Sequence, residues 1–413
     1  MTDTKETTYD LVVFGATSFV GQILTRYLFE TYGLGQSVKW AIAGRSDSKL
    51  NTLKAELGTG ADALPVIVAD ASDQAALEAM CKQTRVIIST VGPYALYGEP
   101  LVQACVRTGT DYCDLTGEVQ WIRKMVERYE EEAKSSGARI VHCCGFDSIP
   151  SDMGVWFLQN KAEETFGAPC RDVRMRVKVA KGEFSGGTVA SMMNVAKEAA
   201  ADPQLRKELA NPFSICPPEH RSKTRQPSLK GAEFDETFQA WLAPFVMGAI
   251  NTRVVHRSNA LQNARYGMEF TYDEAMMTGR GTKGRLAAYG ITGGLAAFFT
   301  ASALRPTRWL VEKFVPKPGE GPSPEAQKNG FYDLRFVGRT EDGKTMITKV
   351  TGDQDPGYGS TGKMLGEAGM CLAFDIPADH SGGFWTPSSL LDGKLLERLT
   401  SKAGLTFEVV ETR

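Results

Sequence analysis

The chain has 413 residues, of which 42% are hydrophobic and 23% charged, and its formal net charge at pH 7 is -2. This length exceeds what one ordinary hydrophobic core uses, so two domains are expected, and the composition is that of a folded chain. The balanced charge excludes the basic excess that a nucleic-acid-binding surface requires. The polar N-terminus lacks the pattern of a secretory signal, so we expect a cytoplasmic protein.

The eight cysteines show no pattern typical of a metal site. They include no C-x-x-C pair and no Cys/His cluster, whereas zinc needs several closely spaced ligands, so we expect no metal. The adjacent Cys143 and Cys144 allow two interpretations. One is a redox switch; the other, which we favour, is a buried strand end in a reducing cytosol.

The N-terminal third of the chain alternates between short apolar runs and helix-like stretches. Residues 10–15 form the first run, which stops at Gly15, and residues 19–28 place their apolar side chains on one helical face. Further strands are predicted over 38–43, 64–69, 86–91, 112–115 and 139–144, and helices over 47–57, 73–82, 99–108 and 118–136. This alternation, with a glycine turn after the first strand, predicts an α/β fold with a Rossmann-type, doubly wound parallel sheet.

The turn after the first strand is typical of a phosphate-binding loop. Residues 15–21 read G-A-T-S-F-V-G, a variant of the dinucleotide fingerprint with Ser18 in place of the middle glycine. Gly15 permits a tight turn, Gly21 permits close packing of helix on strand, and the amides between them face a pyrophosphate at the helix N-terminus. The Ser18 hydroxyl can cap the helix or bond a phosphate oxygen. The predicted contacts of the loop are Gly15, Thr17, Ser18, Phe19, Val20 and Gly21.

The end of the second strand indicates which dinucleotide is bound. NAD enzymes usually place Asp or Glu there to bond the ribose 2′-hydroxyl, but residues 41–46 read A-I-A-G-R-S. Arg45 offers a guanidinium for a 2′-phosphate and Ser46 a further hydrogen bond, so NADP(H) is expected. The alternative is that Arg45 is a solvated loop residue. The other expected cofactor contacts are Gly44 beside Arg45, Asp70 near the adenine, and Val91, Gly92 and Pro93 on the nicotinamide side.

Further motifs extend the pattern along the chain. They are A-G-R (43–45), V-G-P-Y-A-L-Y-G-E-P (91–100), G-T-D-Y-C-D-L-T-G-E (109–118) and C-G-F-D-S-I-P-S-D (144–152), with weaker echoes over 186–191, 320–323 and 355–358. In these motifs the chain resembles the saccharopine dehydrogenase-like oxidoreductases, including the group called trans-acting enoyl reductases in mycobacterial lipid synthesis. The resemblance is dense to residue 152 and sparse beyond, and it is specific for the family but not for a substrate.

The resemblance implies a Rossmann domain, an inserted α+β domain with a mixed sheet, and a C-terminal segment that returns to the first domain. We place an NADP-binding domain at 1–155, a substrate and oligomerisation domain at 156–352, and the returning segment at 353–413. Family enzymes leave the chemistry largely to the cofactor, while the protein positions the substrate against the nicotinamide.

Strand-like runs also occur in the second half of the chain, separated by irregular stretches. They cover 173–179, 267–272, 331–337 and 345–350, and a late helix is predicted over 359–374. In the first run, cations at 174, 176 and 178 alternate with apolar residues. They line either a site for a coenzyme A or phosphopantetheine phosphate or, more commonly, a solvated strand face. Residues 211–231 are expected to form a mobile loop, with a substrate lid as one role, and 316–330 a breaker-rich connection.

Residues 286–304 are uncharged and lie between Arg285 and Arg305. Their length approaches that of a transmembrane helix, but Gly, Ala, Ser and Thr dilute their hydrophobicity. Three interpretations remain open: a membrane span, a membrane-docking surface or gate for lipid substrates, and a buried or interface helix. We favour the third.

No tyrosine in the sequence is followed four residues later by lysine, which excludes the short-chain dehydrogenase mechanism. The catalytic candidates lie after the fourth to sixth strands, where doubly wound sheets bind ligands. Tyr94 and Tyr97 are expected to donate a proton next to a thioester carbonyl, and Asp147 to act with them or simply to cap the helix that follows. Asp114 and Glu118 are further orienting carboxylates, and the four histidines, including His142, are expected to be structural.

Three functions compete. The first is an NADPH-dependent reductase of a lipid-like unsaturated substrate carried as a thioester, and the apolar residues 286–304 favour it. The second is an amino-acid dehydrogenase acting on a secondary amine or imine, which would need an arginine cluster for its carboxylates. The third is a non-catalytic NADP-binding sensor or scaffold at lipid surfaces. The expected partners are a small molecule and, peripherally, a membrane; a homodimer is the expected assembly, and no nucleic acid is expected.

Overall fold

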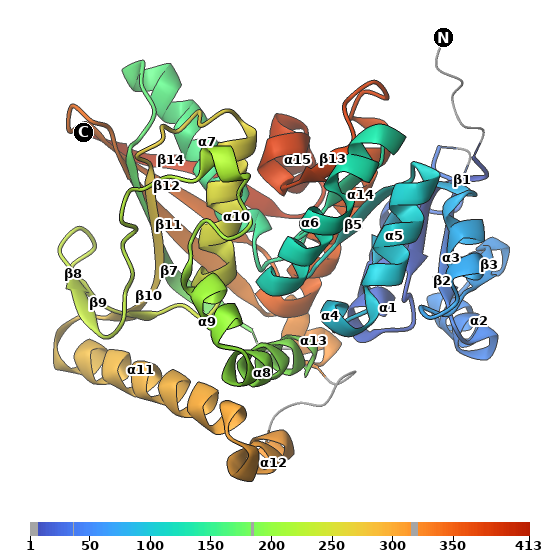
Figure 1. Ribbon diagram of the computed structural model, residues 1–413, viewed down its shortest axis with the longest axis horizontal. Coiled ribbons are helices and arrows are strands. Elements are labelled where there is room, and N and C mark those ends of the chain that lie inside the picture. The colour runs from blue at the N-terminus through green and yellow to red at the C-terminus, as the bar shows by residue number, and fades with distance from the viewer. Residues whose placement is uncertain (1–6, 36, 183–185, 315–320) are drawn as a thin grey trace. The chain divides into compact units, whose positions relative to one another are not determined.

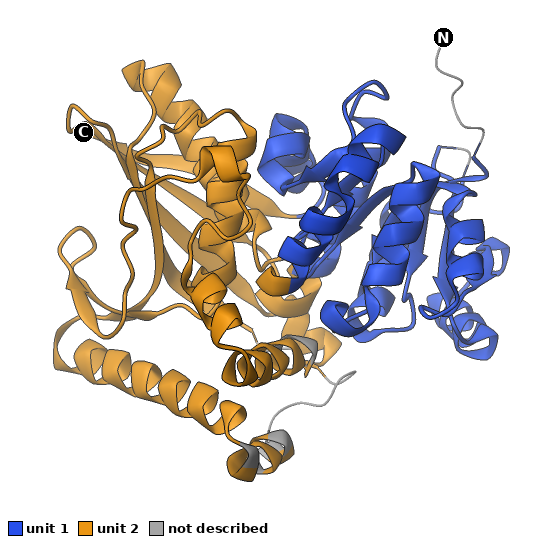
Figure 2. Ribbon diagram, viewed as in Figure 1, with its two compact units in different colours: residues 1–116, 121–145, 361–403 blue, residues 117–120, 146–360, 404–413 orange. Residues whose placement is uncertain are grey.

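The computed structural model describes residues 7–35, 37–182, 186–314 and 321–413. The chain forms two compact units (Figure 2). Unit 1 comprises residues 1–116, 121–145 and 361–403, and unit 2 comprises 117–120, 146–360 and 404–413. The chain therefore leaves unit 1 after Gly145, returns to it at Thr361 and ends in unit 2.

Unit 1 is built on a seven-stranded parallel sheet with the order β13-β6-β5-β4-β1-β2-β3 (Figure 1). Its strands are β1 (Tyr9–Phe14), β2 (Trp40–Gly44), β3 (Val66–Val68), β4 (Thr84–Ser89), β5 (Asp111–Asp114), β6 (Arg139–Val141) and β13 (Gly383–Trp385). The six predicted strands and the doubly wound order are confirmed, while β13 was not predicted. The order reverses between β1 and β4, which is where such sheets bind their ligands.

Six of the described helices of this unit match predicted helices to within a few residues, while α4 and α15 were not predicted. They are α1 (Phe19–Tyr32), α2 (Asp47–Leu57), α3 (Gln74–Cys81), α4 (Tyr94–Tyr97), α5 (Glu99–Thr108), α6 (Val119–Ser136), α14 (Thr361–Phe374) and α15 (Asp392–Ser401). Ser18, Ser46 and Asp73 cap α1, α2 and α3, each accepting the amide three residues on. A 3₁₀ turn at Ala61–Ala63 and a π turn at Pro387–Leu391 complete the unit.

The late helix α14 joins the C-terminal segment to the first domain. Gly362 and Gly366 let it approach α1 closely, because a Cβ on Gly362 would lie 2.9 Å from Ile23 Cγ2. The fully buried Glu367 accepts hydrogen bonds from Tyr27 Oη at 2.6 Å and Tyr32 Oη at 2.7 Å, both on α1. A buried carboxylate needs such partners. These hydrogen bonds therefore hold α14, which lies in the segment that returns to unit 1, against α1.

Unit 2 is built on a mixed seven-stranded sheet with the order β14-β12-β11-β7-β10-β9-β8. Among the described strands of this sheet, β7 and β10 pair in parallel and all other neighbours pair antiparallel. Its strands are β7 (Asp172–Lys181), β8 (Glu233–Asp235), β9 (Ala240–Pro244), β10 (Thr271–Gly279), β11 (Phe331–Arg339), β12 (Thr345–Gly352) and β14 (Leu405–Thr412). The mixed sheet is confirmed, but the strand predicted over 267–272 starts at Thr271, because Gly267 has a φ of 94° and makes a turn. β8, β9 and β14 were not predicted.

The helices of unit 2 are α7 (Ile149–Phe166), α8 (Gly186–Ala201), α9 (Pro203–Ala210), α10 (Gly248–Leu261), α11 (Gly281–Ala303), α12 (Arg305–Phe314) and α13 (Pro324–Lys328), with a 3₁₀ turn at Pro218–His220 and a π turn at Pro356–Ser360. α7 packs on β11 and β12. Gly154 makes the close approach possible, because a Cβ there would lie 2.3 Å from the ring of Phe336. The helix α11 contains the apolar residues 286–304 up to Ala303.

The two segments predicted to be loops differ in structure. Residues 211–231 are largely irregular, as expected, but they are packed against the rest of the unit: Arg257 of α10 donates to the carbonyl of Ile215. Gln226 also accepts from the amide of Tyr272 at 3.1 Å. The structure thus shows a packed segment and does not test the lid role. Within 316–330, residues 316–320 lie outside the described part of the chain, and 324–328 form α13.

The solvated face predicted for the cations of β7 is confirmed for Arg174 and Lys178, which are exposed, and is wrong for Arg176. Arg176 is only 3% exposed and pairs with Asp235 at 2.8 Å and Asp273 at 3.1 Å, from strands distant in the sequence. Arg174 pairs with Asp172 of the same strand at 3.0 Å, and Lys178 pairs with Asp333 at 3.3 Å. Each cation therefore has an acidic partner within the unit, which argues against the phosphate site.

Candidate functional site

The loop after β1 has the tight geometry that its glycines predict. Gly15 has a φ of 83°, and a Cβ there would lie 2.6 Å from Val91 Cγ2. A Cβ on Gly21 would lie 2.2 Å from the carbonyl oxygen of Gly15. These two glycines let the start of α1, the loop and the end of β4 approach one another, which leaves backbone, without side chains, facing the carboxyl ends of β1 and β4.

Ser18 caps α1, as the sequence analysis allowed. Its Oγ accepts the amide of Gly21 at 2.9 Å and lies 2.9 Å from Thr90 Oγ1. The amide of Ser18 itself donates to Gly15 O at 2.8 Å. Gly15 and Ala16 also donate their amides, to Ala43 O, so four of the loop's amides already have acceptors. The amides of Thr17 and Val20 are the donors that we expect the loop to offer to a diphosphate. Phe19 is the first residue of α1.

Arg45 follows directly after Gly44, the last residue of β2, and its side chain is exposed. Ser46 caps α2, accepting the amide of Lys49 at 3.4 Å. Asp70, after β3, accepts hydrogen bonds from the hydroxyl of Ser72 at 2.7 Å and from its amide at 2.9 Å. These bonds lower the pKa of Asp70, with a further contribution from the charge of Arg45. A guanidinium and a carboxylate thus lie at the edge where an adenosine ribose would bind.

The end of β4 supplies the other wall of this site. Thr90 donates its hydroxyl to Gly15 O at 2.9 Å and its amide to Phe14 O at 3.0 Å, so the turn at Val91, Gly92 and Pro93 starts directly beside the loop after β1. Thr90 begins the turn that was expected on the nicotinamide side, and its position after a strand that neighbours β1 was the signal for it.

The structure separates the roles of the two candidate tyrosines. Both lie on α4, but Tyr94 is only 5% exposed and donates its hydroxyl to Ser89 O at 3.0 Å. Its ring packs against Trp121 with the centroids 5.4 Å apart. Tyr97 is 50% exposed. As proton donors both stay predictions, and the exposed hydroxyl of Tyr97 is the more accessible of the two.

Asp114 and His142 form a buried pair that the sequence analysis missed. His142 Nδ1 lies 2.8 Å from Asp114 Oδ2, which also accepts from Tyr112 Oη at 2.9 Å. Asp114 is the last residue of β5, and His142 follows the last residue of β6. Because Cys113 of β5 pairs with Val141 of β6, the register of these two strands could have placed Asp114 and His142 side by side. His142 is enclosed by aromatic rings, with Trp121 at 4.9 Å. Asp114 therefore orients a histidine in the core of unit 1.

Asp147 lies in unit 2, on the loop before α7. The helix is capped at Ser148, whose side chain makes no capping hydrogen bond, so the interpretation of Asp147 as a simple cap is wrong. Within the described chain its carboxylate has no hydrogen-bond or ion-pair partner. A Cβ on Gly117 would lie 3.8 Å from Asp147 Oδ2 and 3.8 Å from Met247 Cε. Burial raises the pKa of Asp147 from 3.8 to about 7.

Three other buried acidic and basic residues of unit 2 are less suited to a role in proton transfer, because they have hydrogen-bond partners or stay neutral. Glu118 is 1% exposed and accepts from Ser191 Oγ at 3.1 Å. Burial raises the pKa of Glu274 to about 7, but its carboxylate accepts hydrogen bonds from Tyr272 Oη at 2.7 Å and Asn251 Nδ2 at 2.9 Å. Burial lowers the pKa of His256 to about 3, so this histidine is neutral and structural. Asp147 is thus set apart from these groups by its lack of a partner.

The cysteines are all buried, and all are free thiols. Cys143 and Cys144 follow the last residue of β6, which is the buried strand end that we favoured. In the described ranges, no group of three His, Cys, Asp or Glu side chains is arranged to hold a metal ion.

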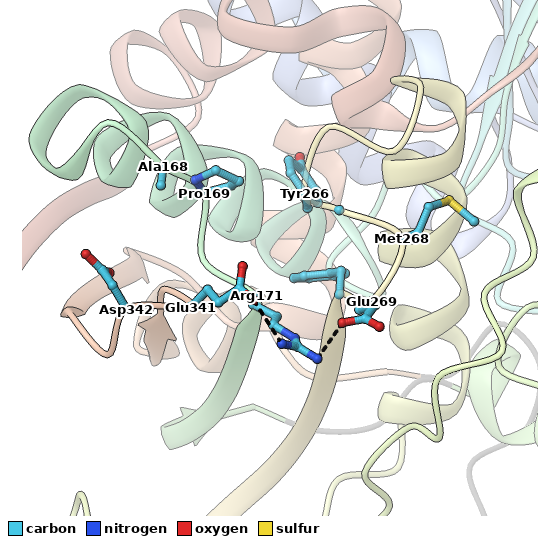
Figure 3. A pocket seen from close by; sticks show the side chains of 10 residues that line it. Ala168, Pro169, Arg171, Tyr266, Met268, Glu269, Glu341 and Asp342 are labelled. Atoms are coloured by element: carbon cyan, nitrogen blue, oxygen red, sulfur yellow. Dashed lines mark ion pairs between the residues drawn. The ribbon is translucent and has the colours of Figure 1, made fainter.

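A cavity of about 370 Å³ lies in unit 2 (Figure 3). Its wall contains Arg171, which pairs with Glu269 at 2.5 Å and Glu341 at 3.6 Å. Tyr266 and Met268 line it from the turn before β10. None of the predicted cofactor or catalytic residues lines this cavity.

The residues at the β1–β4 switch point suit a phosphorylated dinucleotide. The loop after β1, with the amides of Thr17 and Val20 available, would hold the diphosphate, and the exposed Arg45 would meet a 2′-phosphate. When bound, NADPH supplies the hydride, and the protein supplies orientation. The fold and this site define a dinucleotide-dependent oxidoreductase with a Rossmann domain.

Comparison with known proteins identifies the family of the chain. The saccharopine dehydrogenase NADP binding domain matches residues 11–141. A Mycobacterium tuberculosis protein named for a trans-acting enoyl reductase is 40% identical over 97% of each chain, and the trans-acting enoyl reductase of Mycobacterium ulcerans is 35% identical over 95% of each. A saccharopine dehydrogenase from Saccharomyces cerevisiae shares the fold, with a TM-score of 0.54 at 11% identity over 98% of this chain and 100% of that one.

The chain therefore belongs to the saccharopine dehydrogenase-like oxidoreductases, in the group that contains the proteins named trans-acting enoyl reductases. It is an NADP-dependent oxidoreductase.

Substituting Gly21 with Ala is expected to abolish NADPH binding and to destabilise unit 1 by roughly 1–3 kcal/mol, the usual cost of forcing a methyl group into a packed site. The new Cβ would meet the backbone of Gly15 and Ala16, which cannot rotate away. Thermal denaturation and NADPH titration measure the two effects. Gly35→Ala is the matched control, since a Cβ at Gly35 meets nothing within 4 Å. Unchanged NADPH affinity in Gly21→Ala would contradict the role of the loop.

Proposed function

We propose that this enzyme uses NADPH to reduce the carbon–carbon double bond of a lipid-like substrate carried as a thioester. Hydride addition at the β-carbon leaves negative charge on the α-carbon and the thioester oxygen, so a proton must be supplied at the α-carbon. The observation that carries the proposal is the unpartnered carboxyl of Asp147, whose pKa of about 7 keeps it substantially protonated at neutral pH. The names of the relatives support the same reaction.

Asp147 suits the role of proton donor for a physical reason. A carboxyl held by several donors would stay ionised, whereas one that is desolvated and unpaired keeps its proton and releases it when charge develops beside it. The neighbouring Gly117 leaves space next to the carboxyl, and Met247 gives the site an apolar, adaptable side. Tyr97 is the alternative donor, because the residue is half exposed.

The paired cations of unit 2 favour a lipid-like substrate over an amino dicarboxylate. An amino-acid dehydrogenase needs arginines free to bind carboxylates, but Arg174, Arg176 and Lys178 are all neutralised by acidic partners. The exposed apolar helix α11 gives unit 2 a surface compatible with acyl chains. The free, buried cysteines suit the reducing cytoplasm, which is part of the proposal. A homodimer stays a prediction.

The direct test is NADPH oxidation by the purified chain with trans-2-enoyl thioesters of increasing acyl length, and in parallel with amino-acid and oxo-acid pairs that form imines. We expect turnover with the enoyl thioesters and a kcat/KM that rises with acyl length, since each buried methylene adds roughly 0.8 kcal/mol of binding. Turnover with imine-forming pairs alone would contradict the proposal. NADPH binding without any turnover would favour the non-catalytic alternative.

A further inference from the structure

A long apolar helix is exposed on unit 2. The surface formed by α11 (Gly281–Ala303) and α12 (Arg305–Phe314), here called the α11–α12 surface, runs along the edge of the unit below β9 and α8 in Figure 1. In the described chain α11 is the helix long and apolar enough to cross a membrane, yet only 11% of its most apolar stretch is buried. Leu286 is 68% exposed, and Trp309 on α12 is 54% exposed. The favoured prediction was a buried or interface helix. Its buried alternative is wrong for this chain taken by itself, and its interface alternative stays a prediction.

One side of α11 is firmly attached to unit 2. Gly284, Ala288 and Ser302 are buried along its length. Gly284 lies against β10, where a Cβ would come within 2.3 Å of Gly279 O. The guanidinium of Arg285 lies 5.3 Å from the ring centroid of Trp241 on β9. Insertion of α11 across a membrane would break these contacts with the sheet, so they disfavour a membrane span. They hold the helix as part of the folded unit.

Cations outnumber acids in the sequence of this helix and its flanks. Residues 280–314 contain six cations and one acid, Glu312. Arg280, Lys283 and Arg285 lie at the start of the stretch and Arg305, Arg308 and Lys313 at its end, with an uncharged run between them. At one end the amine of Lys313 lies 4.3 Å from the ring centroid of Trp309. Apolar residues flanked by cations and aromatic rings are typical of helices that lie in the interface of an anionic membrane.

The same charges argue against a second copy of the chain as the occupant. Gly290, Gly293, Gly294 and Ala297 would allow close packing of two such helices. However, pairing this surface with itself would bring an uncompensated cationic excess together, which costs free energy. An anionic lipid surface complements both the charge and the exposed apolar side chains.

We propose that unit 2 docks on anionic lipid bilayers through the α11–α12 surface, with α11 lying in the plane of the headgroups. Leu286, Tyr289 and Phe299 insert among the upper acyl segments, and the cations at the two ends contact lipid phosphates. This docking does not depend on the proposed reaction, although it would bring the enzyme to a source of lipid-like substrates.

Flotation of the full chain with vesicles tests the proposal, using phosphatidylcholine alone and phosphatidylcholine with about 30% phosphatidylglycerol. We expect binding to the anionic vesicles, weakened roughly tenfold or more by Leu286→Glu with Tyr289→Glu, and similarly by Arg280→Glu with Lys283→Glu. Val68→Glu and Lys230→Glu are the matched controls, since Val68 is 54% exposed in unit 1 and Lys230 is an exposed cation elsewhere in unit 2. Both controls should bind as the unmodified chain does.

NADPH affinity and thermal denaturation check that each variant is folded. NADPH oxidation with a short, water-soluble enoyl thioester separates docking from catalysis, because loss of vesicle binding with unchanged turnover affects the docking proposal alone. Absence of vesicle binding would overturn the proposal, as would equal binding to neutral and anionic vesicles. A dimer in light scattering that Gly293→Leu dissociates, without vesicle binding, would overturn it in favour of a second copy.

Discussion

Replacing Arg45 with Ala is expected to weaken NADPH binding roughly 10- to 100-fold and to leave NADH binding within about twofold, because a charged hydrogen-bonded pair contributes about 1.5–3 kcal/mol. The side chain is exposed after the last residue of β2, where the chain offers no carboxylate for a ribose 2′-hydroxyl. The guanidinium would pair only with the 2′-phosphate that distinguishes NADPH. Calorimetric titration of both dinucleotides measures the effect.

Lys49→Ala is the matched control, since Lys49 is an exposed cation on the first turn of α2 close in sequence to Arg45. It should change the affinity for NADPH less than about twofold, as expected for a screened surface charge. If Arg45→Ala binds NADPH as tightly as the unmodified chain, the guanidinium is a solvated loop residue and the basis for cofactor selection is wrong.

Replacing Asp147 with Asn is expected to lower kcat for enoyl reduction by about 10²–10⁴, the usual contribution of a positioned general acid. The unmodified enzyme should lose activity as the pH rises through about 7, because the carboxyl must be protonated to donate. The variant should show a flat profile in that range. The measurement is kcat against pH with saturating NADPH and substrate.

The same substitution should stabilise unit 2 at high pH. Folding raises the pKa of Asp147 from 3.8 to about 7, so its favourable contribution is fully present below pH 3.8 and is lost as the pH rises through 7. Asp147→Asn removes an ionised, desolvated group at pH 8 and should raise the free energy of unfolding there on the order of 1–3 kcal/mol, with no gain near pH 4. A gain in stability together with a loss of activity is typical of a functional residue.

Glu274→Gln provides the control for this prediction. Burial raises the pKa of Glu274 to about 7 as well, but its carboxylate already holds hydrogen bonds from Tyr272 and Asn251. Its substitution should leave the pH dependence of kcat in place. If Glu274→Gln flattens the profile and Asp147→Asn does not, the proton donor has been assigned to the wrong carboxyl.

Much of unit 1 could be predicted because its signals are local. The helix predicted over 47–57 matches α2, and that over 99–108 matches α5. Capping serines, helical periodicity and the breaking glycines all act within a few residues. The loop at 15–21 could likewise be recognised from its own residues, since Gly15 and Gly21 act on the backbone around them.

Long-range pairing and burial could not be predicted in this way. The strand β13 has three residues, too few for a periodic signal, and it joins the sheet by pairing with β6 far back in the sequence. The pairing of Asp114 with His142 depends on the register of β5 and β6. The ion pairing of the buried Arg176 depends on acids from β8 and β10, whose positions no local pattern of β7 shows.

The amino-acid sequence by itself determined the doubly wound domain, and it predicted the phosphate-binding loop and the cation expected to select the dinucleotide, because each of these rests on backbone preferences or side-chain chemistry within a short stretch. Only the tertiary structure decided that the apolar helix α11 is exposed, and that Asp147 is unpartnered in the described chain and sufficiently desolvated for its pKa to rise although the residue is only partly buried. Exposure and desolvation are properties of the surroundings, and the surroundings of each residue are assembled from segments distant in the chain.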